Sequence, residues 1–177
     1  MRLFVALAPP SEVLADVDAA LGPARTLQAD LRWIPAERWH LTLAFYGEVP
    51  DESLTGVIEK VGRKLSRRPL PGPIELSFSG SGHFSRRALW VGVDGDMDRL
   101  RALARSLITD RRPYRAHLTV ARLRGGQDAT RAAEVLSSYA GPVWRADEVH
   151  LVRSFLGPRP RYETVSSWPV TGPAAES

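Results

Sequence analysis

Two of the four histidines in this chain stand in nearly the same five-residue setting. His40 begins the segment HLTLA, and His117 begins the segment HLTVA seventy-seven positions later. With average residue usage, such a repeat is expected by chance in about one chain of this kind per thousand. The repeat therefore indicates that the two histidines serve a common purpose, and an imidazole is well suited to moving a proton near neutral pH.

Both segments are apolar and β-prone, and a strand separates its side chains onto two faces. Because the faces alternate, His40 and Thr42 share one face, as do His117 and Thr119. A threonine hydroxyl donates a hydrogen bond to an anionic oxygen. Two imidazoles across a phosphodiester supply one base and one acid. The pattern predicts general acid–base catalysis that requires no metal.

Other interpretations of the histidines are weaker. A single strand histidine is usually structural, and the repeated setting is what favours function here. Catalytic zinc usually has three protein ligands, and neither cysteine nor an H-E-x-x-H pattern supplies them. Serine catalysis is disfavoured because no G-x-S-x-G segment occurs. We expect His83 to be an exposed loop residue, with approach to an anion as the alternative, and His150 to be structural.

The rest of the chain alternates segments typical of strands with segments typical of helices. The expected strands cover 2–8, 39–47, 74–82, 88–93, 115–123, 148–156 and 161–170. The expected helices cover 13–22, 52–65, 97–108 and 129–139. We expect Ser11 to cap the first helix, residues 24–37 to be irregular, and the proline-rich segment 66–73 to be a loop.

The order of these elements repeats. Strand, helix, HLT strand, helix and strand follow one another in the first part of the chain and again in the second. We predict an α+β fold of two pseudo-symmetric lobes made by duplication, each with an antiparallel sheet flanked by helices, whose H-x-T-x motifs face a central cleft. Residues 1–177 would form one domain of two interleaved lobes, with 172–177 a disordered tail.

The composition is that of an ordinary globular protein, with 44% apolar and 25% charged residues. No run of about 18 apolar residues could span a membrane, and the first apolar stretch is too short for a signal peptide. Cysteine is absent, so we expect a cytoplasmic protein, and further a monomer without metal or cofactor. The net charge is +4, and only Lys60 and Lys64 are lysines. Arginine favours an anionic substrate, although a biased genome composition would also enrich it.

The two H-x-T-apolar motifs, HLTL at 40–43 and HLTV at 117–120, resemble the signature of the two-histidine (2H) phosphoesterases. Within that superfamily the chain is most similar to the RNA 2′,3′-cyclic phosphodiesterases, historically named 2′-5′ RNA ligases. The likeness extends to MRLFVALAPP, HLTLAFYGEV, FSRRALWVGV, YRAHLTVAR and VRSFLGPRPRYETV, and so covers nearly the whole chain. Ala116 departs from the family, in which a proline commonly precedes the second histidine. This difference affects the stiffness of the backbone and changes no catalytic residue.

The resemblance implies hydrolysis of a terminal 2′,3′-cyclic phosphate on RNA to a 2′-phosphate. It makes His117 the general base that activates water, and His40 the general acid that protonates the departing 3′ oxygen. It assigns Thr42 and Thr119 to the phosphate oxygens.

The resemblance also assigns Arg122 to the phosphate and Phe45 to stacking on the terminal base. Each lies five positions after its histidine, which in a regular strand is the opposite face. A bulge or a strand end must therefore turn both side chains toward the cleft. For Phe45, a place in the core is the alternative.

Three functions stay open at this point. The first is hydrolysis of cyclic phosphates, on RNA ends or on small 2′,3′-cyclic nucleotides. The second is 2′-5′ RNA ligation, the reverse chemistry in the same cleft. The third is a non-catalytic module that binds RNA ends through arginines and Phe45, which the presence of two complete histidine–threonine pairs disfavours.

Overall fold

The chain forms two antiparallel sheets, seen in a computed structural model that describes residues 1–84, 87–108, 113–155, 157 and 160–171. Sheet A has the order β3-β1-β8-β9, made of β1 (Arg2–Leu7), β3 (Leu41–Glu48), β8 (Glu148–Phe155) and β9 (Arg161–Pro169). Sheet B has the order β2-β6-β5-β4-β7, made of β2 (Arg32–Trp33), β4 (Ile74–Phe84), β5 (Ala88–Gly95), β6 (His117–Arg122) and β7 (Trp144–Ala146). The helices are α1 (Ser11–Ala20), α2 (Gly22–Leu27), α3 (Leu54–Arg67), α4 (Met97–Leu107) and α5 (Thr130–Leu136), with 3-10 turns η1 (Ala36–Arg38) and η2 (Asp51–Ser53).

The two sheets repeat one arrangement. In sheet A the motif strand β3 pairs with β1, and β1 pairs with β8. In sheet B the motif strand β6 pairs with β5, and β5 pairs with β4. Strand β8 comes from the second half of the chain but joins β1 and β3, and β4 comes from the first half but joins β5 and β6. The two halves of the chain are therefore interleaved. This arrangement confirms the predicted α+β fold of two similar lobes.

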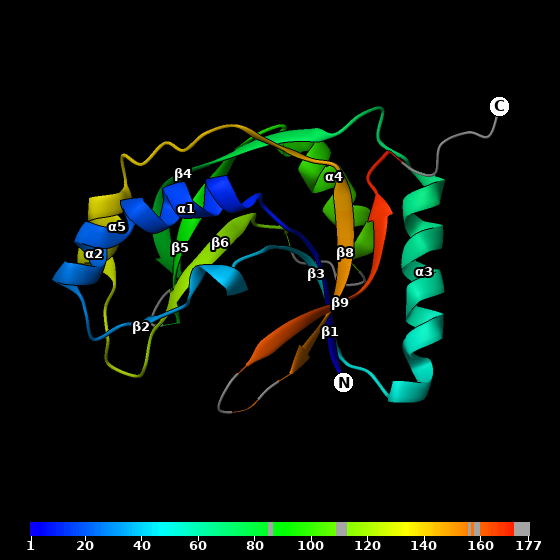
Figure 1. The fold of residues 1–177 in the computed structure, drawn as a ribbon, viewed down its shortest axis with the longest axis horizontal. Helices are drawn as coiled ribbons and strands as arrows, with labels where there is room; N and C mark the ends of the chain where they lie inside the picture. Colours follow the sequence, from blue (N-terminus) through cyan, green and yellow to red (C-terminus); the bar gives the residue numbers. More distant parts are fainter. Residues whose placement is uncertain (85–86, 109–112, 156, 158–159, 172–177) are drawn as a thin grey trace.

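The helices are exchanged between the two sheets in the same way (Figure 1). Helix α1 follows β1 in the sequence but lies with α2 and α5, and α5 packs on β4 and β5 of the other sheet. Helix α4 follows β5 but packs on β3 and on α3. The buried side of α4 carries Leu100, Leu103, Ala104 and Leu107, whose spacing of three and four residues forms one apolar stripe.

The apolar face of each motif strand closes the core of its lobe. Leu41, Leu118 and Val120 are fully buried, and Leu43 is 1% exposed. Burying such a side chain stabilises the fold by about 1.5–3 kcal/mol. Because these four residues fix one face of each strand against the helices, the histidines and threonines between them project from the other face.

Two local predictions are wrong. Ser11 does not cap α1: it is the first helical residue, Pro10 precedes it at the cap position, and no side chain caps the helix. Residues 24–37 are not irregular throughout, because α2, β2 and η1 lie there. Helix α2 starts with a proline in its first turn, where the missing N–H costs nothing.

Strand β7 has no counterpart among the expected elements. It is three residues long and exists because it pairs with the edge of β4, a contact that no local pattern announces. The predicted disordered tail, 172–177, lies outside the described residues.

Candidate active site

The two motif strands meet at a cleft between the sheets. Strands β3 and β6 contact each other, and His40, Thr42, His117 and Thr119 all line one cleft of about 680 Å³. Each of these four side chains is partly exposed, whereas the residues between them are buried. The structure thus brings the two histidine–threonine pairs together, as the alternation of strand faces predicts.

Each imidazole is anchored by the carbonyl group two residues before it. Nδ1 of His40 lies 3.0 Å from the oxygen of Arg38, and Nδ1 of His117 lies 2.7 Å from the oxygen of Arg115. A carbonyl oxygen only accepts hydrogen bonds, so Nδ1 is the donor and carries a proton in both rings. In the neutral ring, Nε2 then holds the lone pair that can take up and return a proton.

Aromatic side chains pack against both rings. The ring of His40 stacks on Phe4 with centroids 4.5 Å apart, and it meets Tyr162 edge to face at 5.1 Å. The ring of His117 meets Phe84 edge to face at 4.9 Å. Such pairs contribute about 0.5–1.5 kcal/mol each beyond their burial. Together with the carbonyl anchors, they hold each imidazole in one orientation.

Both imidazoles have lowered pKa values. Burial lowers the pKa of His40 to about 4, and the positive charges of Arg122 and Arg38 act in the same direction, while the hydrogen bond to the Arg38 carbonyl opposes them. Burial also lowers the pKa of His117, again with help from the charge of Arg122. Both rings are therefore mostly neutral at pH 7 in the free protein. Arg122, which lines the same cleft, thus acts on the pKa of both rings.

A bulge in β3 turns Phe45 into the cleft. Thr42 and Ala44 pair with consecutive residues of β1, so Leu43 between them has no partner. Leu43 and Ala44 are both buried, and the next residue, Phe45, returns to the side of Thr42. There its side chain is 68% exposed and lines the cleft. Phe45 is therefore a cleft residue and not a core residue.

Strand β6 has a matching bulge at the same place in its motif. Thr119 and Ala121 pair with consecutive residues of β5, so Val120 has no partner. Val120 and Ala121 are both buried, and Arg122 returns to the cleft side with its side chain exposed. Both bulges lie three positions after a motif histidine, and they confirm that the strands must be irregular for Arg122 to reach the cleft.

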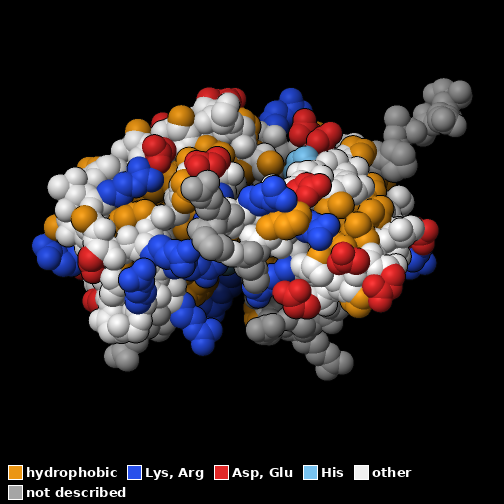
Figure 2. Space-filling view, turned by 60° about the horizontal axis from the view of Figure 1, so that its bottom comes forward, with side chains coloured by type: hydrophobic (Ala, Val, Ile, Leu, Met, Phe, Trp, Pro, Cys, Tyr) orange, Lys and Arg blue, Asp and Glu red, His pale blue; other side chains and the backbone are white. Residues whose placement is uncertain are grey.

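The cleft is strongly basic. Figure 2 shows Lys and Arg side chains gathered along the hollow between the two lobes. Among the described residues that line the cleft there is no Asp or Glu. The arginines that line it are Arg2, Arg32, Arg38, Arg87 and Arg122. Of these five arginines, only Arg122 is predicted from the sequence. The other four are not, because an isolated arginine carries no periodic signal.

The other two histidines do not line the cleft. His83 lies in β4 rather than in a loop; it is exposed, and its Nε2 atom is 3.4 Å from the hydroxyl of Thr130. Nδ1 of His150 lies 2.8 Å from the hydroxyl of Ser167 on the neighbouring strand. Within the described parts of the chain, no three His, Cys, Asp or Glu side chains gather where they could hold a metal ion.

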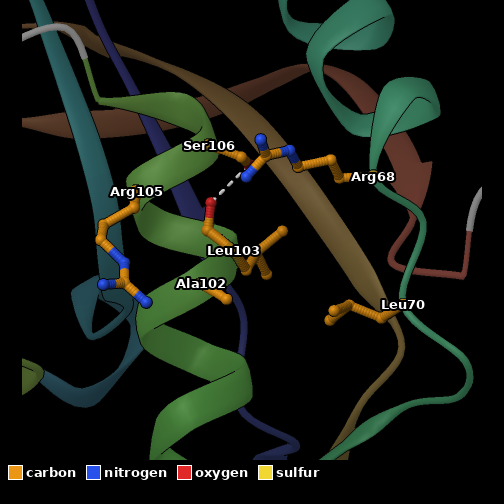
Figure 3. A pocket seen from close by; sticks show the side chains of 6 residues that line it. All are labelled: Arg68, Leu70, Ala102, Leu103, Arg105 and Ser106. Atoms are coloured by element: carbon orange, nitrogen blue, oxygen red, sulfur yellow. Dashed lines mark hydrogen bonds between the residues drawn. The ribbon is translucent and has the colours of Figure 1, made fainter.

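A further hollow, of about 450 Å³, lies beside α4 (Figure 3). In Figure 3, Arg68 reaches toward α4 from the end of α3. The residues that line this hollow are Arg68, Leu70, Ala102, Leu103, Arg105 and Ser106. None of these six side chains exchanges a proton near neutral pH, so the candidate chemistry belongs to the cleft. No helix in the part of the chain that is described has the length and apolarity to cross a membrane.

Two lobes that each present an H-x-T strand to one basic cleft have the architecture of a two-histidine phosphoesterase. A model of the 2′-5′ RNA ligase superfamily matches residues 9–156, which is well over half of the chain. The chain belongs to this superfamily.

Relatives extend over most of the chain. It is 31% identical over 193 residues to a Thermus thermophilus protein named RNA 2′,3′-cyclic phosphodiesterase, a match that covers 97% of the chain and 91% of that protein. It is 29% identical over 183 residues to a Geobacillus stearothermophilus protein of the same name, covering 96% of the chain. The chain spans only 57% of the length of that second relative.

Solved structures share the fold. A crystal structure of a Thermus thermophilus protein superposes with a TM-score of 0.71 at 26% identity, covering 97% of this chain and 99% of the other. A crystal structure of E. coli LigT complexed with 3′-AMP superposes with a TM-score of 0.72 at 26% identity, covering 96% and 98%.

Proposed function

We propose that the cleft hydrolyses the terminal 2′,3′-cyclic phosphate of RNA to a 2′-phosphate by acid–base catalysis without a metal. The observation that carries this proposal is the pair of imidazoles, His40 and His117, each anchored through Nδ1 and each lining the same basic cleft. The names of the relatives support the substrate. The five arginines support an anionic ligand.

Four further side chains would hold the substrate. The hydroxyls of Thr42 and Thr119 have no hydrogen-bond partner among the described residues, so they are free to donate to phosphate oxygens. Arg122 can offer a planar pair of N–H groups to the same phosphate. The exposed ring of Phe45 offers a surface for the terminal base, a contact worth about 1–3 kcal/mol.

In the proposed reaction, His117 is the base and His40 the acid. Nε2 of His117 takes a proton from a water molecule while the water oxygen bonds to phosphorus. The bond between phosphorus and O3′ breaks, O3′ takes a proton from Nε2 of His40, and the phosphate stays on O2′. One proton has passed to His117 and one has left His40, and exchange with solvent restores both rings.

Phosphate binding would prepare the acid. His40 has a pKa of about 4 in the free protein, whereas a general acid must be protonated. A negative phosphate beside the rings raises the pKa of both imidazoles and offsets the charge of Arg122. The assignment of His40 as the acid rests on the family resemblance, since the lowered pKa leaves this ring neutral in the free protein near pH 7.

We expect kcat/KM to reach its maximum below pH 6.5 and to fall as the pH rises. This constant reports the free protein, and the reaction needs one protonated and one neutral imidazole. Because burial lowers the pKa of both rings, the half-protonated pair is most abundant on the acidic side of the ordinary histidine pKa. The maximum of kcat should lie at higher pH, since bound phosphate raises both pKa values. Profiles on 2′,3′-cyclic AMP check this, and a kcat/KM maximum above about pH 7.5 would contradict it.

One experiment separates the three candidate functions. RNA with a 2′,3′-cyclic phosphate end is incubated with the protein and EDTA, alone or with a second RNA that has a 5′-hydroxyl end. We expect loss of the cyclic phosphate without joined product. A joined 2′-5′ product as the main outcome would favour ligation, and salt-sensitive binding without turnover would favour a binding module.

A further inference from the structure

The charge of the cleft exceeds what a cyclic mononucleotide can balance. Five arginines line it, with no Asp or Glu among the described lining residues. A nucleoside 2′,3′-cyclic phosphate carries one negative charge, and Arg122 with the two threonines already suffices for one phosphate. An RNA chain brings a further negative charge with each phosphodiester. The surplus of arginines therefore indicates that the cleft binds more of the RNA than its last nucleotide.

Three of the arginines form a contiguous group, the arginine edge, made of Arg32, Arg87 and Arg122. Strand β2 places Arg32 directly opposite Arg122. On the other side of β6, Ala88 lies opposite Arg122, and Arg87 directly precedes it. Neighbouring strands lie about 4.8 Å apart, so Arg32 and Arg87 leave the sheet on opposite sides of Arg122, on the two strands that flank β6. All three are exposed.

No carboxylate among the described residues pairs with a member of the arginine edge. Like charges directly opposite each other in a sheet are destabilising. Other arginines pair with carboxylates, as Arg25 does with Asp18 and Arg99 with Asp96. No member of the edge makes an ion pair or a side-chain hydrogen bond with any described residue. The repulsion at this edge is relieved when an anion binds there.

We propose that Arg32 and Arg87 bind the phosphodiester that joins the terminal nucleotide to the rest of the RNA. The proposal rests on the proposed function, in which Arg122 takes the cyclic phosphate. A backbone phosphate one nucleotide away then meets the arginines on either side of Arg122. These two residues make the protein prefer an RNA chain over a cyclic mononucleotide.

The test compares two substrates that differ by one nucleotide, and hence by one backbone phosphodiester: 2′,3′-cyclic AMP and diadenylate ending in a 2′,3′-cyclic phosphate. In the variant Arg32→Gln/Arg87→Gln, kcat/KM for the dinucleotide should fall about 10–100-fold, as expected for lost charge-assisted hydrogen bonds. The fall for 2′,3′-cyclic AMP should stay within about threefold, since this substrate lacks the second phosphate. The control Arg131→Gln removes an exposed arginine of α5 outside the cleft and should change neither value. Equal falls on both substrates, or no fall on the dinucleotide, would overturn the proposal.

A binding measurement keeps this test separate from turnover. In the background His40→Ala/His117→Ala, the affinities of the same two ligands are measured over a range of salt concentrations. The dinucleotide should bind more tightly and with the steeper salt dependence, by a slope difference of about 0.7 for its one additional phosphate. The two glutamine substitutions should remove that difference. If the unmodified protein turns over neither substrate, the proposed function fails. The binding difference still shows whether Arg32 and Arg87 bind the backbone phosphodiester.

Discussion

Replacing either His117 or His40 with alanine is expected to lower kcat for hydrolysis of an RNA 2′,3′-cyclic phosphate by about 10²–10⁴-fold. Each variant removes one of the two proton carriers and leaves Thr42, Thr119 and Arg122 in place to bind the phosphate. The losses should therefore appear mainly in kcat and much less in KM. Initial rates with chromatographic separation of substrate and product measure both constants.

The matched control is His83→Ala, which removes a strand histidine that does not line the cleft. It should change kcat by no more than about twofold, because no step of the reaction passes through it. Full activity in both cleft variants would refute the paired-histidine mechanism. Loss in the control alone would place the chemistry elsewhere.

A modified substrate separates the acid from the base. When sulfur replaces the bridging O3′, the leaving group departs as a thiolate, which needs no proton because a thiol has a pKa of only about 8.5. We expect His40→Ala to lose less than about tenfold on this substrate, while His117→Ala still loses about 10²-fold or more. The reverse pattern would exchange the two roles, with His40 as the base and His117 as the acid.

The second large effect is expected at Arg122. Arg122→Ala should lower kcat by about 10²–10³-fold, because a positive group aimed at a reacting phosphate stabilises charge that develops in the transition state. Arg122→Lys keeps the charge but loses the planar fork, so it should recover only part of the rate. Kinetics of the three proteins on the same cyclic-phosphate substrate give the comparison.

Arg122 also has a signature that a purely structural residue would lack. Its charge lowers the pKa of both His40 and His117. Without it both pKa values rise, so the maximum of kcat/KM in Arg122→Ala should move to higher pH. The melting temperature should not fall, because the side chain is exposed and faces the like charge of Arg32. An unchanged pH profile with a large loss of thermal stability would contradict the role proposed for Arg122.

The motif strands were predictable because local chemistry determines them. Alternation alone places Leu41 and Leu43 in the core and His40 and Thr42 on the other side, and the same logic holds for the second motif. The repeat of element order predicted two similar lobes. The exchange of strands between the sheets depends on pairings such as β1 with β8, which join opposite ends of the chain.

The positions of Phe45 and Arg122 show where local reasoning ends. Strand alternation assigns both to the wrong face, and the family resemblance alone required an irregular strand. The bulges fall at Leu43 and Val120, two ordinary apolar residues that resemble any other strand residue. Their irregularity arises from pairing with β1 and β5, so nothing in the motifs themselves marks it.

The rest of the cleft was missed for a related reason. Arg32 lies in β2, a strand of two residues that forms only by pairing with β6, ninety positions away. Tyr162 reaches His40 from β9, near the other end of the chain. These residues gather through long-range contacts, and a single sequence carries no sign of which distant aromatic or arginine will meet which histidine.

The most direct test of the central proposal is the identity of the product that the unmodified protein makes from RNA ending in a 2′,3′-cyclic phosphate. Phosphorus NMR distinguishes a 2′-phosphate from a 3′-phosphate in the presence of EDTA. We predict complete conversion to the 2′-phosphate, at the same rate with and without the chelator. A 3′-phosphate product, activity lost to EDTA, or no conversion would contradict the proposed reaction.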